Sequence, residues 1–483
     1  MSRKIAFASN EVAPFAKVGG LADVAGSLPK ALVELGHDVR LMMPAYQMVL
    51  DATQPTPLFG GKPVEVVCGP EWTEQAYFWE TKLGEVTVWL IGSDHFFRDT
   101  VSSQTVYLPG EEQHLFFARA LMALCERAGW IPDVIHANDW HTGFVPVFLR
   151  ESAGPAWKST ASVFTIHNLA YQGEFGPDIL AECGLPWSLF NHHQLETYGA
   201  VNFLKSGCVF ADQVNTVSPR YAEEIQTPGF GCRLEGLMQF LASQKRLSGI
   251  VNGIDQHEFN PEIDPHIPAH FSAADLSGKA ECRAELRKEL GLDDRPGVPL
   301  FGVVSRLSSQ KGIDLIVEIA DAMMGLPSQL IVQGLGEPWL AEQLRHLEVR
   351  YPHQVRFVER FDAPLAQRVY AGCDGFLMPS AFEPCGLGQL IAMRYGTIPV
   401  VRYTGGLANT VRDGHNGFVF ADFQPDALLA TIQRATTAFA QPEHWAQLVG
   451  QAMETDSSWA TSAADYVALY ERAIEARRMH QAA

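Results

Sequence analysis

The chain has 483 residues, 47% of them hydrophobic and 19% charged, which excludes a disordered or fibrous protein and allows two or three globular domains. The formal net charge of −19 disfavours nucleic acid and anionic membranes as partners, because an acidic surface repels phosphate groups. The eight cysteines form no C-x-x-C pair, and we find neither an apolar signal region nor a run of about 18 apolar residues. We therefore expect free thiols, no membrane span and a cytoplasmic location.

The first half of the chain alternates short apolar runs with amphipathic helical patterns. After the first run, Leu21, Val24 and Leu28 recur at helical spacing, and Gly36 is expected to end that helix. The strands predicted in this half are Ile5–Ala8, Val39–Met43, Val134–His136, Val163–Ile166 and Val214–Val217.

The same alternation restarts in the second half, with helices predicted at Ile313–Met324 and Trp339–Val349. A segment with Asn252-Gly253, several prolines and a charged helical stretch, Lys279–Leu290, joins the two halves. The strands predicted here are Leu300–Val304, Leu330–Val332, Val355–Val358, Phe376–Met378 and Ile398–Val401.

Two runs of alternating strands and helices indicate an α/β fold with two doubly wound, Rossmann-like domains and parallel sheets. We place the domains at residues 1–250 and 251–460, followed by a C-terminal helical segment at residues 461–483. In such sheets ligands bind outside the carboxyl ends of the strands, so the loops that leave the strands are expected to hold the site.

The loop after the first strand reads Lys17-Val-Gly-Gly-Leu-Ala-Asp23 and precedes a helix. Its glycines, Gly19 and Gly20, let backbone N–H groups approach an anion, and Lys17 adds a full charge. The pattern is neither a Walker A motif nor G-x-G-x-x-G. A plain turn with a surface lysine would give the same residues, so both interpretations stay open at this point.

Two further strand-exit loops have residues suited to a sugar nucleotide. Arg306 and Lys311 follow one strand, five residues apart, which suits two cations on a diphosphate, although two solvated surface cations remain possible. Glu383 follows another strand between Phe382 and Pro384, where a carboxylate can bind sugar hydroxyls or stabilise an oxocarbenium-like centre. A helix N-terminal carboxylate is the alternative for Glu383.

Two histidine-containing segments also end strands: His136-Ala-Asn-Asp139-Trp-His141 and Thr165-Ile-His167-Asn168. We expect these histidines to bind hydroxyl groups or to be structural, and no third ligand suggests a metal site. The sequence has no Asp-x-Asp triplet, so arginine and lysine would neutralise a diphosphate instead of a metal.

In their order along the chain, these motifs resemble those of the bacterial glycogen synthase and plant starch synthase family. The resemblance spans about residues 4 to 475 and rests on six stretches: Lys17-Val-Gly-Gly-Leu-Ala-Asp-Val, His136-Ala-Asn-Asp-Trp-His, Thr165-Ile-His-Asn-Leu-Ala-Tyr-Gln-Gly, Ser305-Arg-Leu-Ser-Ser-Gln-Lys-Gly, Phe382-Glu-Pro-Cys-Gly-Leu and Thr404-Gly-Gly-Leu. It implies the GT-B architecture, with two Rossmann-like domains facing across a deep cleft and the last helix packed on the N-terminal domain.

The resemblance implies a retaining, metal-independent transfer of glucose from ADP-glucose to the non-reducing end of an α-1,4-glucan such as glycogen. No cofactor is expected, since ADP-glucose is a substrate. Glu383, His167, Arg306, Lys311 and Asp139 would be the catalytic residues. The substrate-binding residues would be Lys17, Gly19, Gly20, Asp23, Asn168, Phe361, Cys385, Gly386, Leu387, Thr404, Gly405 and Gly406.

Within that resemblance, Lys17 and the amides of the two glycine pairs would face phosphates, and Phe361 would stack on adenine. Three positions depart from the family pattern: Gly388 replaces a common Thr, Asn409 a usual Asp, and Phe361 a more common Tyr. These departures bear on affinity and donor choice. No residue of the sequence indicates whether ADP-glucose or UDP-glucose is the preferred donor.

Three alternatives remain at this stage. One is another retaining GT-B enzyme with a small-sugar acceptor, and the second is a glucan-binding protein without catalysis. The third is an NAD-dependent dehydrogenase, against which the missing G-x-G-x-x-G motif counts. The oligomeric state is not readable from the sequence.

Overall fold

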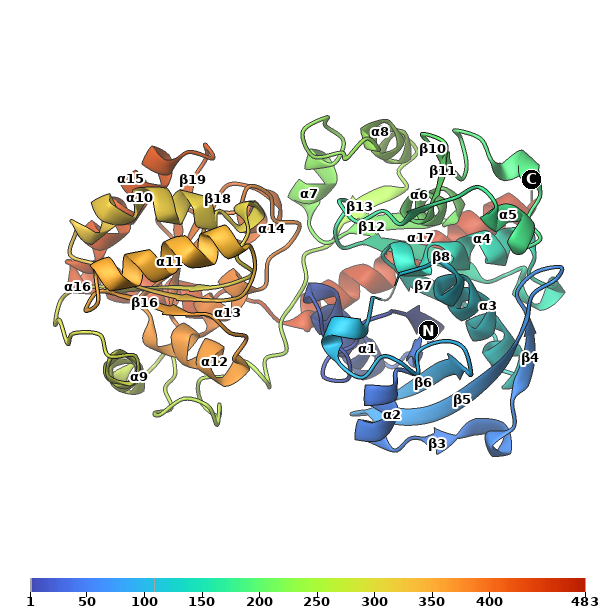
Figure 1. The fold of residues 1–483 in the computed structure, drawn as a ribbon, viewed down its shortest axis with the longest axis horizontal. Helices are drawn as coiled ribbons and strands as arrows, with labels where there is room; N and C mark the ends of the chain where they lie inside the picture. Colours follow the sequence, from blue (N-terminus) through green and yellow to red (C-terminus); the bar gives the residue numbers. More distant parts are fainter. Residues whose placement is uncertain (1, 108, 483) are drawn as a thin grey trace. The chain divides into compact units, whose positions relative to one another are not determined.

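The structure is a computed structural model that describes residues 2–107 and 109–482. The chain forms two compact units. The first unit comprises Met1–Val217, Ala222–Ile250 and Trp459–Ala483, and the second comprises Ser218–Tyr221 and Val251–Ser458. Figure 1 draws both with the colours following the sequence, so the last helix is red within the mostly blue and green first unit.

A ten-stranded sheet forms the centre of the first unit, in the order β13-β12-β8-β7-β1-β2-β6-β5-β3, with β4 paired to β5. The strands from β13 to β6 are parallel, and β5 runs antiparallel to β6. The strands are β1 (Lys4–Ala8), β2 (Asp38–Pro44), β3 (Thr56–Pro57), β4 (Val64–Val67), β5 (Thr73–Leu83), β6 (Val86–Ser93), β7 (Val134–Asn138), β8 (Ala161–Ile166), β12 (Gln213–Thr216) and β13 (Leu247–Gly249).

Helices cover this sheet, and a small three-stranded sheet stands apart from it. The small sheet consists of β9 (Glu174–Phe175), β10 (Glu196–Thr197) and β11 (Ala200–Asn202). The helices are α1 (Gly20–Glu34), α2 (Gln47–Thr53), α3 (Glu112–Arg127), α4 (Phe144–Glu151), α5 (Ile179–Glu182), α6 (Phe203–Phe210), α8 (Glu235–Ser243) and α17 (Trp459–Ala482), and the short α7 (Pro219–Glu224) has residues in both units. The central strands β7 and β8 are buried along their whole length, as expected of parallel strands covered on both faces.

The last helix, α17, packs on β7, β8, β12 and α1 of the first unit (Figure 1). A buried polar chain joins it to the sheet. His136 Nδ1 lies 2.8 Å from Tyr470 Oη, and His136 Nε2 lies 2.6 Å from Thr165 Oγ1. Thr165 Oγ1 donates to Asn215 Oδ1, and Asn215 Nδ2 donates to Tyr466 Oη. Since the Thr165 hydroxyl proton is donated to Asn215, His136 Nε2 must donate to Thr165 Oγ1. His136 Nδ1 then accepts the hydroxyl proton of Tyr470.

The second unit has a six-stranded parallel sheet in the order β16-β15-β14-β17-β18-β19. Its strands are β14 (Leu300–Val304), β15 (Gln329–Gln333), β16 (Val355–Val358), β17 (Gly375–Met378), β18 (Ile398–Arg402) and β19 (Phe418–Phe420). Its helices are α9 (Ser277–Glu289), α10 (Ile313–Met324), α11 (Pro338–Arg350), α12 (Ala363–Gly372), α13 (Gly388–Arg394), α14 (Gly405–Thr410), α15 (Pro425–Phe439) and α16 (Pro442–Met453).

Every strand predicted from the sequence is present, and no predicted end differs from the observed one by more than two residues. The helix predicted at Ile313–Met324 has those bounds, because its apolar residues form one buried face. The antiparallel β5–β6 pair and the small sheet were not predicted from the sequence. The side chains of β5 alternate between buried and exposed at its start, which is typical of a strand covered on one face and differs from the continuous apolar runs of the predicted strands.

Candidate active site

In the first unit, the predicted site residues follow the carboxyl ends of three neighbouring strands. The parallel registers of β1 with β7 and of β7 with β8 bring these ends to one edge of the sheet. Lys17 lies in the loop after β1, Asp139 follows β7, and His167 follows β8. The Lys17 motif, more than a hundred residues from the other two in the sequence, therefore follows a strand that ends at the same edge, where ligands bind in this class of sheet.

Lys17 and Asp23 form an ion pair across the loop after β1, with Lys17 Nζ donating to Asp23 Oδ1 at 2.6 Å. Burial raises the pKa of the Asp23 carboxyl, and the Lys17 ammonium acts in the opposite direction. The lysine side chain is 41% exposed and the aspartate 22%. The ammonium is thus held at the surface of the loop, where it can meet an anion.

The two glycines of this loop differ in what their amides contact. The Gly19 N–H donates to Glu11 Oε2 at 2.7 Å, so the amide expected to face the diphosphate is already bound within the chain. Gly20 is the first residue of α1, where N–H groups lack intrahelical acceptors. A Cβ at either glycine would meet no atom within 4 Å. Internal packing therefore does not require glycine here, and the outer side of the loop is open.

Asp139 and His167 are in direct contact. Asp139 Oδ1 accepts the His167 N–H at 2.7 Å, and the Asp139 N–H donates to Thr165 O at 2.9 Å. The φ of Asp139 is 55°, in the left-handed region that non-glycine residues seldom adopt outside functional sites and turns. Burial raises the pKa of Asp139 to about 7, while the amides of His167 and Asn168 favour the ionised form.

The His167 ring is held by its neighbour on β7. His167 Nε2 lies 2.9 Å from Asn138 Oδ1, and Asn138 Nδ2 donates to Ala8 O. Burial lowers the pKa of His167 to about 3, so the ring is neutral near pH 7. Since the Asn138 oxygen is the acceptor, Nε2 holds the proton and Nδ1 is an acceptor, suited to a hydroxyl donor such as a sugar O–H.

In the second unit, Lys311 and Glu383 form a close ion pair. Lys311 Nζ donates to Glu383 Oε2 at 2.5 Å, and Ser380 Oγ donates to the same oxygen at 3.2 Å. The glutamate side chain is only 7% exposed, against 20% for the lysine. The two predicted residues come from different strand-exit loops, and their side chains are in direct contact in the structure.

Gly312 explains how these two loops approach. It has φ 71°, and a Cβ there would lie 2.1 Å from Pro379 O, so only glycine allows the contact. The Ala381 N–H also donates to Gln310 O at 2.8 Å. Arg306 lies on the same loop, with its guanidinium 3.5 Å from Gln310 Oε1. The loop after β14 therefore presents both predicted cations.

The Gly405-Gly406 pair packs on the backbone that holds Glu383. The Gly406 N–H donates to Glu383 O and Pro384 O, each at 3.1 Å. A Cβ at Gly405 would lie 1.8 Å from Glu383 O, and one at Gly406 would lie 2.1 Å from Cys385 O. The Gly406 amide is thus bound inside the chain rather than turned to a phosphate as expected, and both glycines serve this close approach.

The remaining predicted residues of the second unit have varied surroundings. Cys385 is buried, and burial raises the pKa of its thiol to about 12, so it is a packed thiol and not a nucleophile. Thr404 is buried before α14, and Gly386 adopts φ 74° before Leu387, the residue that precedes α13. Phe361 is 77% exposed. Such a ring is available for stacking, and its place at an adenine stays a prediction.

Four residues of these two clusters escaped the sequence analysis: Glu11, Tyr107, Asn138 and Ser380. Glu11 accepts hydrogen bonds from the loop of Lys17, and the Tyr107 hydroxyl donates to Glu11 Oε1. Asn138 lies inside the histidine motif that begins at His136, so its position at the end of β7 was a usable signal. Tyr107 lies far from every motif, and only the fold brings it to Glu11.

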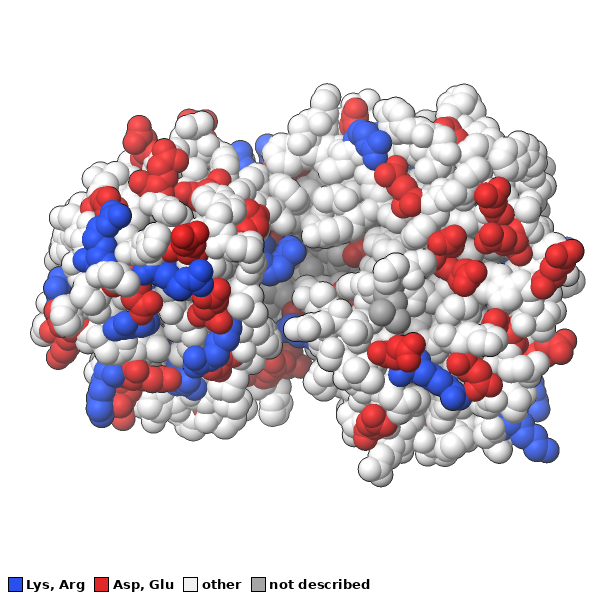
Figure 2. Space-filling view, viewed as in Figure 1, with Lys and Arg blue, Asp and Glu red and all other residues white. Residues whose placement is uncertain are grey.

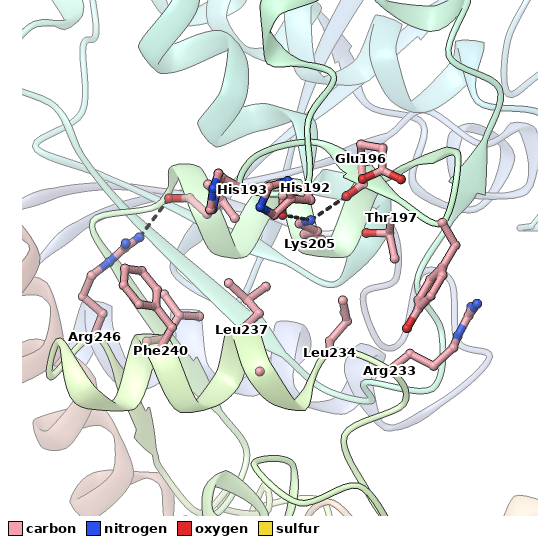
Figure 3. Close-up of a pocket in the computed structure, with 14 residues that line it drawn as sticks. His192, His193, Glu196, Thr197, Lys205, Arg233, Leu234, Leu237, Phe240 and Arg246 are labelled. Atoms are coloured by element: carbon pink, nitrogen blue, oxygen red, sulfur yellow. Dashed lines mark hydrogen bonds between the residues drawn. The ribbon is translucent and has the colours of Figure 1, made fainter.

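A separate cavity of about 660 Å³ lies between α8 and the segment from His192 to Lys205 (Figure 3). Leu234, Leu237 and Phe240 form its apolar side. Lys205 Nζ donates to the carbonyls of His192 and Glu196 on the opposite side. None of the residues predicted for the site lines this cavity.

On the face of the second unit that Figure 2 draws, acidic and basic side chains are interspersed. Arg350 pairs with Asp321, Arg356 with Glu348, and Arg345 with Glu359.

Among residues 2–107 and 109–482, no group of three His, Cys, Asp or Glu side chains is placed to hold a metal ion. Within the same described ranges, no helix is both long and apolar enough to span a bilayer.

Comparisons with known proteins give the family. Residues 4–240 match the family described as starch synthase catalytic domain, and residues 283–447 match glycosyl transferases group 1. The glycogen synthase of Desulforudis audaxviator is 44% identical over 491 residues, which cover 98% of this chain and 97% of that protein. The chain belongs to the glycogen and starch synthase family. A dehydrogenase is thereby excluded.

Other members of the glycogen and starch synthase family are similar to this chain over nearly its whole length. The glycogen synthase of Syntrophotalea carbinolica is also 44% identical, over 98% of this chain and 99% of that protein. The solved catalytic domain of starch synthase IV from Arabidopsis thaliana, bound to ADP and acarbose, is 34% identical with a TM-score of 0.91. The match covers 98% of this chain and 100% of that one. The prediction of two Rossmann-like domains of the GT-B type is thereby confirmed.

Proposed function

We propose that this glycogen synthase family member transfers glucose from ADP-glucose to the non-reducing end of an α-1,4-glucan, with retention of the anomeric configuration. The observation that supports the proposal most is the full-length agreement with a starch synthase whose solved structure holds ADP and acarbose. The donor and acceptor classes follow from that agreement. The chain's own residues supply groups that suit them.

The diphosphate is assigned to Lys311 and Arg306, the two cations on the loop after β14. As the bond from the glucose C1 to the phosphate oxygen breaks, negative charge develops on the leaving diphosphate, and fixed cations lower the energy of that state. No cofactor or metal is needed in this scheme, because the cations belong to the chain.

The transferred glucose is assigned to Glu383 in the second unit and to His167 and Asp139 in the first. Glu383 can accept a sugar O–H, and the neutral His167 offers Nδ1 as an acceptor. Asp139 holds the backbone of His167 in place.

We favour attack by the acceptor on the same face from which the diphosphate departs. The new bond joins the acceptor O4 to C1 while the C1–phosphate bond breaks, and the acceptor's hydroxyl proton passes to the diphosphate. A double displacement would need Glu383 as nucleophile, but its Oε2 is already bound by Lys311 and Ser380. A carboxylate that is neutralised in this way is a poor nucleophile.

The compartment is a further part of the proposal. All eight cysteines are free thiols, and seven of them are buried. Such thiols persist in a reducing compartment, and we place the enzyme in the cytoplasm.

The test is glucose incorporation into glycogen from ADP-glucose and, separately, from UDP-glucose. The wild type should extend glycogen with ADP-glucose, and Glu383→Gln should reduce kcat by at least about 100-fold. Glu285→Gln, an exposed glutamate on α9 of the same unit, is the matched control and should be unchanged. A folded wild type that incorporates glucose from neither donor would refute the proposal.

A further inference from the structure

Glu11 is a buried carboxylate that none of the roles above uses. It lies three residues after β1 and is 4% exposed. The turn that follows is closed by the paired hydrogen bonds between Val12 and Ala16, 2.9 and 2.8 Å long. This turn leads directly into the Lys17–Gly20 segment, the loop that the sequence predicts to face the phosphates of the donor, and Glu11 contacts that segment.

The Glu11 carboxylate binds two consecutive amides of that loop. Its Oε2 accepts the N–H groups of Val18 and Gly19, both at 2.7 Å. Successive N–H groups that converge on one point form a concave anion site of the kind that binds phosphates elsewhere. Here the anion is part of the chain, so the inner amides of the loop are already saturated.

The other oxygen of Glu11 is fixed as well. Glu11 Oε1 accepts the hydroxyl of Tyr107, and that ring stacks on His141 with centroids 4.5 Å apart. The carboxylate is therefore held from two sides and has no freedom to turn toward a substrate. This arrangement argues against Glu11 as a general base or nucleophile, because both of its oxygens are engaged with donors.

The outer side of the loop, with Lys17 and the Gly20 N–H, is the part that can still bind the donor. Gly20 N–H stands at the first position of α1, and no hydrogen bond from it to another residue is formed within the described ranges 2–107 and 109–482. Lys17 stands at the surface in its pair with Asp23. A ligand phosphate can thus meet the helix N-terminus and the ammonium while Glu11 fixes the loop from below.

We propose that Glu11 is a positioning residue for donor binding, which holds Val18 and Gly19 so that Lys17 and the Gly20 N–H face the diphosphate. The inference rests on the proposed function for the identity of the donor. It assigns the loop's inner amides to the protein and only its outer groups to the ligand. Tyr107 is part of the same device, since its hydroxyl fixes the carboxylate.

The test compares Glu11→Ala, Glu11→Gln and Tyr107→Phe with the wild type. Glu34→Gln, an exposed glutamate at the end of α1, is the control. Steady-state kinetics give KM for ADP-glucose, KM for glycogen and kcat. Calorimetric titration with ADP measures nucleotide binding without turnover.

Glu11→Ala should raise KM for ADP-glucose and the ADP dissociation constant by about tenfold or more, because two charge-assisted hydrogen bonds are lost. KM for glycogen should stay within twofold. Glu11→Gln should largely restore donor binding, since the amide oxygen can accept both N–H groups while its NH₂ donates to Tyr107. That rescue would not follow if only bulk at this position mattered.

Two results would overturn the proposal. The first is a folded Glu11→Ala variant that binds ADP as the wild type does. The second is an equal loss of donor and glycogen binding, which would indicate general damage to the unit. If Glu11→Ala does not fold, Tyr107→Phe decides, with a two- to fivefold weaker ADP affinity expected and an unchanged one contradicting it. If the wild type bound ADP but transferred no glucose, the proposed function would fail while the ADP titrations still tested Glu11.

Discussion

Lys311 Nζ and Glu383 Oε2 lie 2.5 Å apart, and this pair ties the loop after β14 to the loop after β17. The ammonium therefore has two tasks. It neutralises a glutamate that is 7% exposed, and it can neutralise the diphosphate that the reaction releases. The two tasks lead to different consequences when the lysine is removed.

Lys311→Ala should lower kcat by about 100- to 1,000-fold, because the charge that develops on the leaving group loses its fixed cation. It should also weaken ADP binding, since the unpaired Glu383 carboxylate repels phosphate. Kinetics with ADP-glucose and calorimetry with ADP measure both effects. Lys288→Ala on α9, an exposed lysine of the same unit, should change neither. Unchanged turnover in Lys311→Ala would remove this residue from the mechanism.

Asp139 should make the first unit less stable as the pH rises. Burial raises the folded-state pKa to about 7, above the unfolded value of about 3.9, so the folded state binds the proton more tightly. The stabilising contribution is complete below about pH 4 and is lost as the pH rises through about 7. Its size is on the order of 4 kcal/mol.

Urea unfolding at pH 5 and pH 8 tests this prediction. The wild type should lose more unfolding free energy between these two values than Asp139→Asn, which has no proton to release. Parallel pH dependence in the two proteins would show that Asp139 ionises normally in the fold.

Gly406→Ala should destabilise the second unit by about 1–3 kcal/mol, because its Cβ would lie 2.1 Å from Cys385 O. The change should also lower activity, since the same backbone carries Glu383. Gly450→Ala is the matched control. It lies within α16, its Cβ meets no atom within 4 Å, and alanine should stabilise that helix by about 0.5–1 kcal/mol. Thermal unfolding of both variants would reveal whether the close contact decides the outcome.

Tyr470→Phe should cost about 1–3 kcal/mol of unfolding free energy, because it leaves the fully buried His136 Nδ1 without a donor. Tyr351→Phe removes a hydroxyl that donates to the exposed Asp321, and its effect should stay within about 0.5 kcal/mol. Chemical denaturation of the two variants makes the comparison. Equal losses would mean that the buried chain through His136 contributes no more than a surface contact.

The parts of the fold that the sequence predicted are those with continuous apolar runs or a clear helical face. β14 and α10 were placed at their observed bounds for this reason. β5 was missed because its side chains do not form such a run, and its place depends on pairing with β6. Pairing between strands is a property of the assembled sheet, which a single-strand pattern does not contain.

The site also has parts that the sequence predicted and parts that it did not. Arg306, Lys311 and Glu383 were found because charged residues after a buried strand are a local pattern. Their pairing was not predictable, because it depends on Gly312 meeting Pro379. The amides of Gly19 and Gly406 were expected to face phosphates, but carboxylate and carbonyl groups elsewhere in the chain bind them. A glycine pair indicates that another group approaches the backbone closely, but it does not indicate whether that group belongs to a ligand or to the chain itself.

The place of α17 in the first unit has a consequence for synthesis on the ribosome. Residues 251–458 of the second unit are made before Tyr466 and Tyr470, so that unit can fold while the first still lacks its last helix. Until those residues emerge, His136 and Asn215 have no partner from α17 for their buried polar atoms. The nascent first unit therefore stays incomplete while more than 200 further residues are translated, and during that time part of its sheet lacks the helix that covers it.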